Sequence, residues 1–159
     1  MSHPLPPTSQ DVDAIAAWSV IRAARALARR LADELAPHGL TPVEFGVLVQ
    51  LAASGDPQGR GGLAQADLAR AVGVRPQSMT VMTRTLAERG LVDLGERRGR
   101  GRRSAVVLTD DGRRLLSRAY PVVLASNDWF GPDPATAPAL VVTLRPLLGP
   151  AEQPAPHVP

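Results

Sequence analysis

Two short helical segments, separated by a tight break and followed by an arginine-rich ribbon, constrain this chain more than any other feature. The first segment covers 63–72 and ends at Gly73, a residue that readily takes the left-handed conformation that closes a helix. The second opens with Arg75 and Pro76, and proline in a first helical turn costs no backbone hydrogen bond. The pattern therefore predicts a helix, a turn and a second helix.

The second of these helices has one apolar face and one polar face. Apolar or small side chains recur at i, i+3, i+4 and i+7 and should point inward: Met79, Met82, Thr83 and Leu86. The opposite face, with the arginine that precedes it, carries short polar groups, one valine and two long donors: Arg75, Gln77, Ser78, Thr80, Val81, Arg84 and Thr85. These residue types can contact base edges, thymine methyls and phosphates. Taken alone, such a face is also typical of a solvated helix surface.

A β-hairpin with a basic loop is predicted next, from a strand at 91–94 and an antiparallel partner at 104–108. The loop between them holds three glycines and five arginines: Arg97, Arg98, Arg100, Arg102 and Arg103. Like charges at this density repel one another unless an anion lies close, and arginine inserts well into a narrow minor groove. A solvated loop without a partner and a membrane-binding segment are the alternatives, and the latter lacks an accompanying apolar face.

Helices are expected elsewhere, over 11–36, 42–53, 110 to about 129, and 139–148. Thr41 and Glu44 are spaced as a capping box, and Thr109 stands where an N-cap is expected. Pro121 should kink or interrupt the helix that contains it. The proline-bearing ends, 1–10 and 149–159, lack periodicity and are predicted to be disordered.

The expected fold is therefore mainly α with a small β-hairpin wing. A winged helix-turn-helix lobe over 41–109 would stand between two helical regions, 11–40 and 110–148. Both flanking regions carry apolar residues on more than one face, which a lone helix pair would leave exposed to water. Dimerisation through these helices is one interpretation, and a larger core within a single chain is the other.

Charge is unevenly distributed along the chain. All 18 cationic residues are arginine, and the net charge is +3. Between Arg60 and Arg118 there are 13 arginines and 6 acidic residues, a net +7, whereas the remainder is net −4. Arginine codons in a GC-rich genome would explain the absence of lysine but not the clustering. A basic middle section indicates a polyanionic partner.

Several classes of protein are disfavoured by what the sequence lacks. Without cysteine there are no disulfides or thiolate metal sites, and three scattered histidines do not form a metal site, so no cofactor or metal is expected. The chain has no apolar run of about 18 residues and no signal-peptide pattern, so a cytoplasmic protein with no membrane partner is expected. Neither a glycine-rich nucleotide loop nor a Ser/His/Asp arrangement is present, which argues against an enzyme.

Residues from about 12 to 130 resemble the MarR family (multiple antibiotic resistance regulators). Four motifs carry the resemblance: Leu68-Ala69, Thr80, Ala87-Glu88-Arg89-Gly90-Leu91-Val92 and Leu108-Thr109-Asp110-Asp111-Gly112. The family usually has Asp-Arg-Arg at the wing tip, where this chain has Arg100, Gly101 and Arg102. We assign the minor-groove contact to Arg102, with Arg100 and Arg103 beside it. Val81 stands where many relatives carry arginine, which favours an unusual base preference.

The resemblance implies a homodimer that binds double-stranded DNA at a near-palindromic operator. It also implies a repressor that a small aromatic or anionic effector releases. Candidates for lining an effector cleft are Trp18, Arg22, His38, Phe45 and Trp129, although each also fits an ordinary core or surface position. The alternative function is a winged-helix protein-interaction module without DNA binding, which the polar helix face and basic wing disfavour.

Overall fold

The computed structural model describes residues 8–55, 61–95 and 105–148. It is mainly helical, with a small antiparallel sheet of strand order β1-β3-β2. The α-helices are α1 (Ser9–Asp13), α2 (Ala16–Leu35), α3 (Pro42–Ala53), α4 (Gln65–Val72), α5 (Pro76–Glu88), α6 (Asp110–Ala125) and α7 (Thr136–Leu144). The 3₁₀ turns are η1 (Ala36–His38), η2 (Ser126–Phe130) and η3 (Arg145–Leu148), and the strands are β1 (Leu63–Ala64), β2 (Val92–Asp93) and β3 (Ala105–Leu108).

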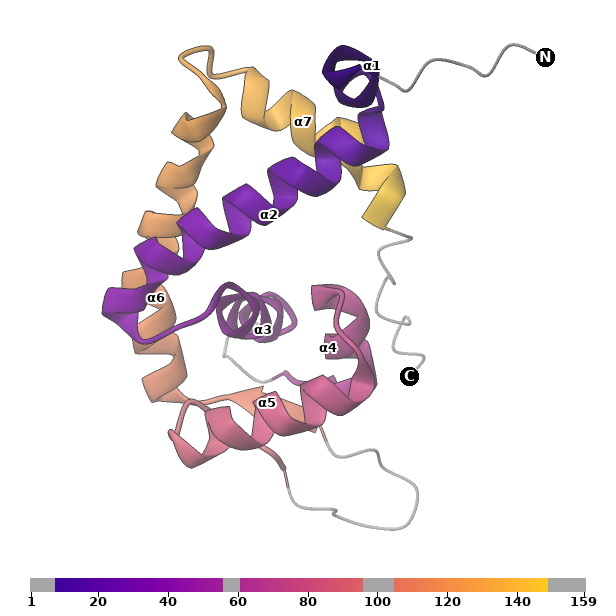
Figure 1. Ribbon diagram of the computed structural model, residues 1–159. Coiled ribbons are helices and arrows are strands. Elements are labelled where there is room, and N and C mark those ends of the chain that lie inside the picture. The colour runs from indigo at the N-terminus through magenta and orange to yellow at the C-terminus, as the bar shows by residue number, and fades with distance from the viewer. Residues whose placement is uncertain (1–7, 56–60, 96–104, 149–159) are drawn as a thin grey trace, which may run out of the picture.

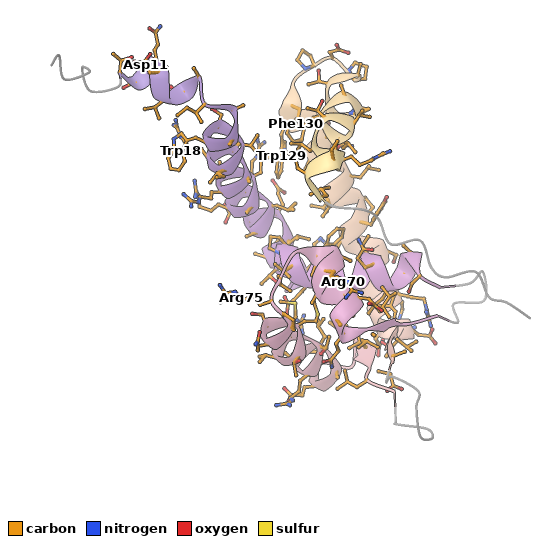
Figure 2. All side chains as sticks on the ribbon, turned by 90° about the vertical axis from the view of Figure 1, so that its right-hand side faces the viewer. Asp11, Trp18, Arg70, Arg75, Trp129 and Phe130 are labelled. Atoms are coloured by element: carbon orange, nitrogen blue, oxygen red, sulfur yellow. The ribbon has the colours of Figure 1, made fainter. Side chains whose placement is uncertain are left out.

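The elements form a lobe and two helical arms. Helices α3, α4 and α5 and the sheet make up the lobe, and α5 lies along its outer edge (Figure 1). Helix α2 forms one arm, and α6 with α7 forms the other. The two arms diverge above the lobe when the molecule is turned by 90° (Figure 2).

The sheet has one strand more than the expected hairpin. Leu63 pairs with Val106 and Ala64 with Ala105, so β1 lies along the free edge of β3. The predicted helix over 63–72 was therefore wrong at its start, and α4 begins at Gln65. A Cβ on Gly62 would lie 2.8 Å from the Val106 carbonyl oxygen, so glycine lets the chain approach this edge.

The N-terminal helix begins earlier than expected and is broken. Thr8 caps α1 in a capping box with Asp11, so residues 9 and 10 are helical and the predicted tail over 1–10 was too long. The Thr8 hydroxyl and backbone N–H bond the Asp11 carboxylate, and these hydrogen bonds lower the pKa of Asp11. The predicted single helix over 11–36 was also wrong, because Ile15 has extended backbone angles and separates α1 from α2.

The C-terminal helices also differ from expectation in their bounds. Helix α6 continues through Pro121 to Ala125, so that proline does not interrupt it. From there to Phe130 the chain forms the 3₁₀ turn η2, so the α-helix expected to reach about Trp129 ends earlier. Helix α7 begins at Thr136 and ends at Leu144, before a 3₁₀ turn that contains Pro146, so the helix expected over 139–148 is displaced toward the N-terminus. The expectation for 149–159 lies outside the described residues.

The core lies in the lobe and is almost entirely aliphatic. Its fully buried side chains come from the end of α2 and from α3, α4, α5 and β3: Leu35, Leu48, Leu68, Met79, Leu86, Val47, Val106 and Thr83. On α3 the buried residues are Phe45, Val47, Leu48 and Leu51, while Ala52 near its end is exposed. No described helix is long and apolar enough to cross a bilayer.

Candidate nucleic-acid interface

Helix α5 is held in the lobe by its apolar face. Met79, Thr83 and Leu86 are fully buried, as the spacing predicted, and Met82 packs partly buried against the core. Pro76 begins the helix after an extended Arg75, which confirms the predicted start. Because one face is fixed inside the lobe, the opposite face must point to solvent.

The solvent-facing side of α5 carries the residues expected to read DNA. Every one of them is exposed: Gln77, Ser78, Thr80, Val81, Arg84 and Thr85. Val81 has 65% of its surface exposed and so contributes little to the core. Arg75 is also exposed and projects from the lobe at the start of the helix (Figure 2). The structure thus brings these residues together on one outward surface.

Gln65 joins α4 to α5, a contact that sequence analysis did not identify. The Thr80 hydroxyl donates to the Gln65 side-chain oxygen at 3.1 Å, and the Gln65 amide nitrogen donates to the Thr83 hydroxyl at 3.1 Å. Thr83 in turn donates to the Met79 carbonyl oxygen at 3.0 Å, which satisfies its buried hydroxyl. Thr80 therefore uses its proton within the protein, and its oxygen is left to accept a bond from outside.

The turn between α4 and α5 follows local chemistry. Gly73 has φ 71° and ψ 32°, the left-handed conformation predicted for it. The Val74 N–H donates to the Ala69 carbonyl at 2.9 Å and the Gly73 N–H to the Arg70 carbonyl at 3.2 Å, which together form a Schellman motif. Helix α5 ends in the same way at Gly90, with the Leu91 N–H donating to the Leu86 carbonyl at 2.9 Å.

The predicted wing is described only at its base. Val92 pairs with Leu108 and Asp93 with Val107 in an antiparallel register, which confirms the two expected strands. The arginines of the loop lie outside the described residues: Arg97, Arg98, Arg100, Arg102 and Arg103. Their role remains a prediction.

The structure does not place the five effector candidates around one cavity. Phe45 is 8% exposed and belongs to the core, and His38 lies in η1. Trp129 lies under the guanidinium of Arg30, with 4.1 Å from the guanidinium carbon to the ring centroid. Trp18 lies on the other side of α2 from Trp129 (Figure 2).

Two open cavities lie on the helices. Of the five effector candidates, Arg22 lines the first, and none lines the second. A cavity of about 480 Å³ follows α2 and is lined by Ser19, Arg22, Ala23, Arg25, Ala26 and Arg29. A second cavity, of about 440 Å³, lies between α3 and α6. Its walls are mostly apolar, with tyrosine, serine and arginine among them: Val49, Ala52, Ala53, Arg113, Leu116, Ser117, Tyr120 and Pro121. Sequence analysis did not single out this second set, because its members come from two helices far apart in the chain.

Comparison with known proteins identifies relatives of this fold. Residues 38–103 match the model of the MarR family. The HTH-type transcriptional repressor Rv2887 of Mycobacterium tuberculosis is 35% identical over 115 residues, which cover 72% of this chain and 78% of the relative. The crystal structure of the M. tuberculosis MarR family protein Rv2887 in complex with DNA is similar with a TM-score of 0.62 and 29% identity, and covers 83% of this chain and 96% of that one.

A second structure of the same M. tuberculosis protein, in complex with salicylic acid, has a TM-score of 0.64 and 30% identity. That similarity covers 83% of this chain and 95% of the other. The similarity to these relatives extends over most of the chain, both in sequence and in fold. The chain belongs to the MarR family of transcriptional regulators.

Proposed function

We propose that this protein is a homodimeric transcriptional repressor that binds a near-palindromic DNA duplex and is released by a small ligand. The observation that carries the proposal is the polar face of α5, which is exposed to solvent. The residues on the opposite face are buried in the lobe and fix the helix in this orientation. A helix presented in this way fits a DNA major groove. The complex of the M. tuberculosis relative with DNA supports this interpretation.

The exposed residues of α5 are assigned distinct tasks. Gln77 reads a base edge, since glutamine bonds adenine in two places, and Val81 contacts a thymine methyl. Arg84 and Arg75 bind phosphate or a guanine edge. Ser78 donates or accepts a single bond at the groove, whereas Thr80 and Thr85, whose protons bond Gln65 and the Val81 carbonyl, accept one. In the wing, Arg102 enters the minor groove, flanked by Arg97, Arg98, Arg100 and Arg103.

A second copy of the chain is proposed to cover the helical arms. Large apolar side chains remain exposed between α1 and α2, on α2, α6 and α7, and in η3: Ile15, Trp18, Val20, Ile21, Tyr120, Leu124, Val141, Val142, Leu147 and Leu148. So much exposed apolar surface is typical of an interface. We therefore assign residues 11–40 and 110–148 to dimerisation and 41–109 to DNA binding.

The ligand is proposed to be a small aromatic anion. The complex of the relative with salicylic acid supports this class. Of the two cavities, the one between α3 and α6 combines apolar walls with the Tyr120 side chain and fits an aromatic ring better than the arginine-lined one. Adding salicylate should therefore weaken DNA binding.

A regulator of this kind acts where the DNA is, in the cytoplasm, and no catalytic step is proposed.

Duplex binding at two salt concentrations tests the proposal. Operators would first be selected from random duplexes with the full chain, and dissociation constants would then be measured by fluorescence anisotropy. A repressor that neutralises several phosphates should lose affinity steeply as salt rises. A protein-interaction module would select no duplex, and that result would contradict the proposal.

A further inference from the structure

The C-terminal end of α5 is tied to the end of α2 and the start of α3 by one arginine. Arg89 follows the last residue of α5, and its guanidinium Nη1 donates to Glu44 Oε1 at 3.0 Å. Its Nη2 donates to the Gly39 carbonyl oxygen at 2.7 Å. Gly39 closes the turn that continues α2, so a single side chain bridges three elements.

Glu44 takes part in two interactions at once. Its Oε2 accepts the Thr41 backbone N–H at 2.8 Å, while its own N–H donates to the Thr41 hydroxyl at 3.2 Å, which completes the capping box of α3. The side chains of Arg89 and Glu44 are 34% and 13% exposed. Because the pair is partly buried, solvent screens it less than an ordinary surface pair. Arg89 thus binds a carboxylate whose position is already set by the capping box at the start of α3.

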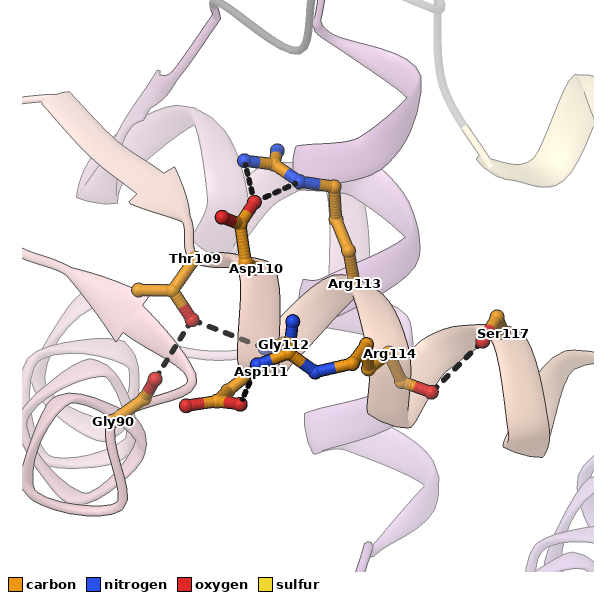
Figure 3. Close-up of polar contacts among 8 residues, drawn as sticks. All are labelled: Gly90, Thr109, Asp110, Asp111, Gly112, Arg113, Arg114 and Ser117. Atoms are coloured by element: carbon orange, nitrogen blue, oxygen red, sulfur yellow. Dashed lines mark hydrogen bonds and ion pairs between the residues drawn. The ribbon is translucent and has the colours of Figure 1, made fainter.

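A second contact ties the residues after α5 to α6. The Thr109 hydroxyl donates to the Gly90 carbonyl oxygen at 2.7 Å and accepts the Gly112 N–H at 3.0 Å (Figure 3). The Thr109 N–H donates to the Leu91 carbonyl oxygen at 3.2 Å. A Cβ on Gly112 would lie 2.1 Å from that same oxygen, so the first turn of α6 lies directly on the chain leaving α5. Thr109 is therefore both the N-cap of α6 and a link to α5.

The two contacts attach α5 to both helical arms at the same end. In its first half and middle, α5 is instead bonded to α4, through Gln65 with Thr80 and Thr83, and these bonds stay within the lobe. In a dimer built from the arms, the attachment of each α5 to its arm sets the distance and angle between the two copies of α5. That geometry determines which spacing between DNA half-sites can be bound by both copies together.

We propose that Arg89, with Thr109 beside it, is a positioning residue that sets the preferred spacing of the DNA half-sites. The inference rests on the proposed function, because it requires a dimer that binds DNA. Arg89 is not assigned a contact to DNA. Its loss should therefore alter the choice of spacing rather than the affinity of one lobe for one half-site.

The test compares variants on duplexes that differ only in half-site spacing. The selected operator, the same operator with one base pair inserted or removed at its centre, and a single half-site would each be titrated with the full chain. We expect the wild type to bind the duplexes of altered spacing at least about tenfold more weakly than the selected operator. A loss of this size is comparable to the cost of one mismatched base pair. Arg89→Gln should reduce this discrimination to about threefold or less, with the half-site affinity and the salt slope unchanged.

Two further variants keep the test decisive. Glu44→Gln keeps an acceptor for the cap of α3 but removes the charged partner of Arg89, so it should reproduce the loss of discrimination if Arg89→Gln fails to fold. Arg114→Gln removes the same charge from a surface pair with Asp111 on α6 and should behave as the wild type. Thermal unfolding of each variant would verify that it is folded.

The outcomes separate this inference from the proposed function. A wild type that binds no duplex overturns both. A wild type that binds and discriminates, with folded variants that discriminate equally well, overturns the positioning role alone. Should Arg89→Gln weaken every duplex equally and lower the salt slope, Arg89 contacts phosphate and the inference is wrong.

Discussion

The lobe and the helical arms are built from the same aliphatic residue types but bury them to very different degrees. In the lobe, Leu48, Leu68 and Met79 are fully buried, whereas Val142 on α7 is 64% exposed and Leu148 in η3 is 82% exposed. Within the lobe, one capping box also begins α3, and left-handed glycines follow α4 and α5. The lobe therefore has a closed core within one chain, whereas the arms leave apolar surface exposed.

The largest expected effect comes from the core of the lobe. Leu68→Ala should lower the free energy of unfolding by about 2–5 kcal/mol, because the side chain is fully buried and its loss leaves a cavity in the core. Urea denaturation at one fixed protein concentration would measure it. Val81→Ala, on the exposed face of α5, is the control and should change stability by less than about 0.5 kcal/mol. Equal losses in both variants would contradict the division between core and DNA-facing surface.

The next effect concerns the arms. Ile21→Glu combined with Val142→Glu should separate the dimer, because both exposed apolar positions would place a charge in the interface. Loss of the second lobe should weaken operator binding by about 100-fold or more. Sedimentation velocity would report the oligomeric state. Val81→Glu should leave the dimer intact, and a double variant that remains dimeric would disprove the assignment of the arms.

The arginines assigned to DNA should have a smaller effect. Arg84→Ala and Arg102→Ala should each weaken operator binding by about tenfold and reduce the slope of log affinity against log salt by about one. Titrations at several salt concentrations would show both changes. Arg114→Ala provides the comparison with a surface arginine on α6. Unchanged affinity in both DNA-facing variants would mean that the interface lies elsewhere.

Gln77 should affect the choice of bases more than the overall affinity. Gln77→Ala removes a side chain that can bond an adenine edge but carries no charge, so the salt slope should not change. Binding to operators altered at one base pair at a time would measure the preference. We expect discrimination at one position in each half-site to fall, by about tenfold at most. A uniform loss at all positions would point to a structural role instead.

The smallest effect concerns the cap of α1. The hydrogen bonds from Thr8 lower the pKa of Asp11 below its ordinary value of 3.8. The cap therefore stabilises α1 fully above pH 3.8, and this stabilisation is lost as the pH falls through the lowered pKa of Asp11. The Thr8 amide resonance in NMR spectra should move over the same range. Asp11→Asn should abolish that movement. A titration midpoint above the ordinary value would contradict the capping geometry.

Local chemistry explains which parts of the fold could be predicted from sequence. The capping box of Thr41 and Glu44, the left-handed Gly73 and the start of α5 at Pro76 each depend on residues within a few positions. The amphipathic pattern of α5 likewise identified both its buried and its exposed face. These features followed from spacing alone.

Contacts between distant segments could not be predicted. By sequence, Leu63 and Ala64 fit the helical pattern of the residues that follow them. In the structure they are extended, because they pair with the edge of β3. The bonds of Gln65 to Thr80 and Thr83, and of Arg89 to Glu44, join helices whose relative placement no local spacing reveals. Phe45 could be expected in a cleft or in the core, and packing of α3 places it in the core.

The stoichiometry of the DNA complex tests the central distinction between lobe and arms most directly. Sedimentation equilibrium of the full chain with its selected near-palindromic duplex should give a mass of two chains per duplex, and the same duplex cut to one half-site should bind far more weakly. One chain per duplex with undiminished affinity, or no complex with any duplex, would show that the arms do not pair two DNA-reading lobes.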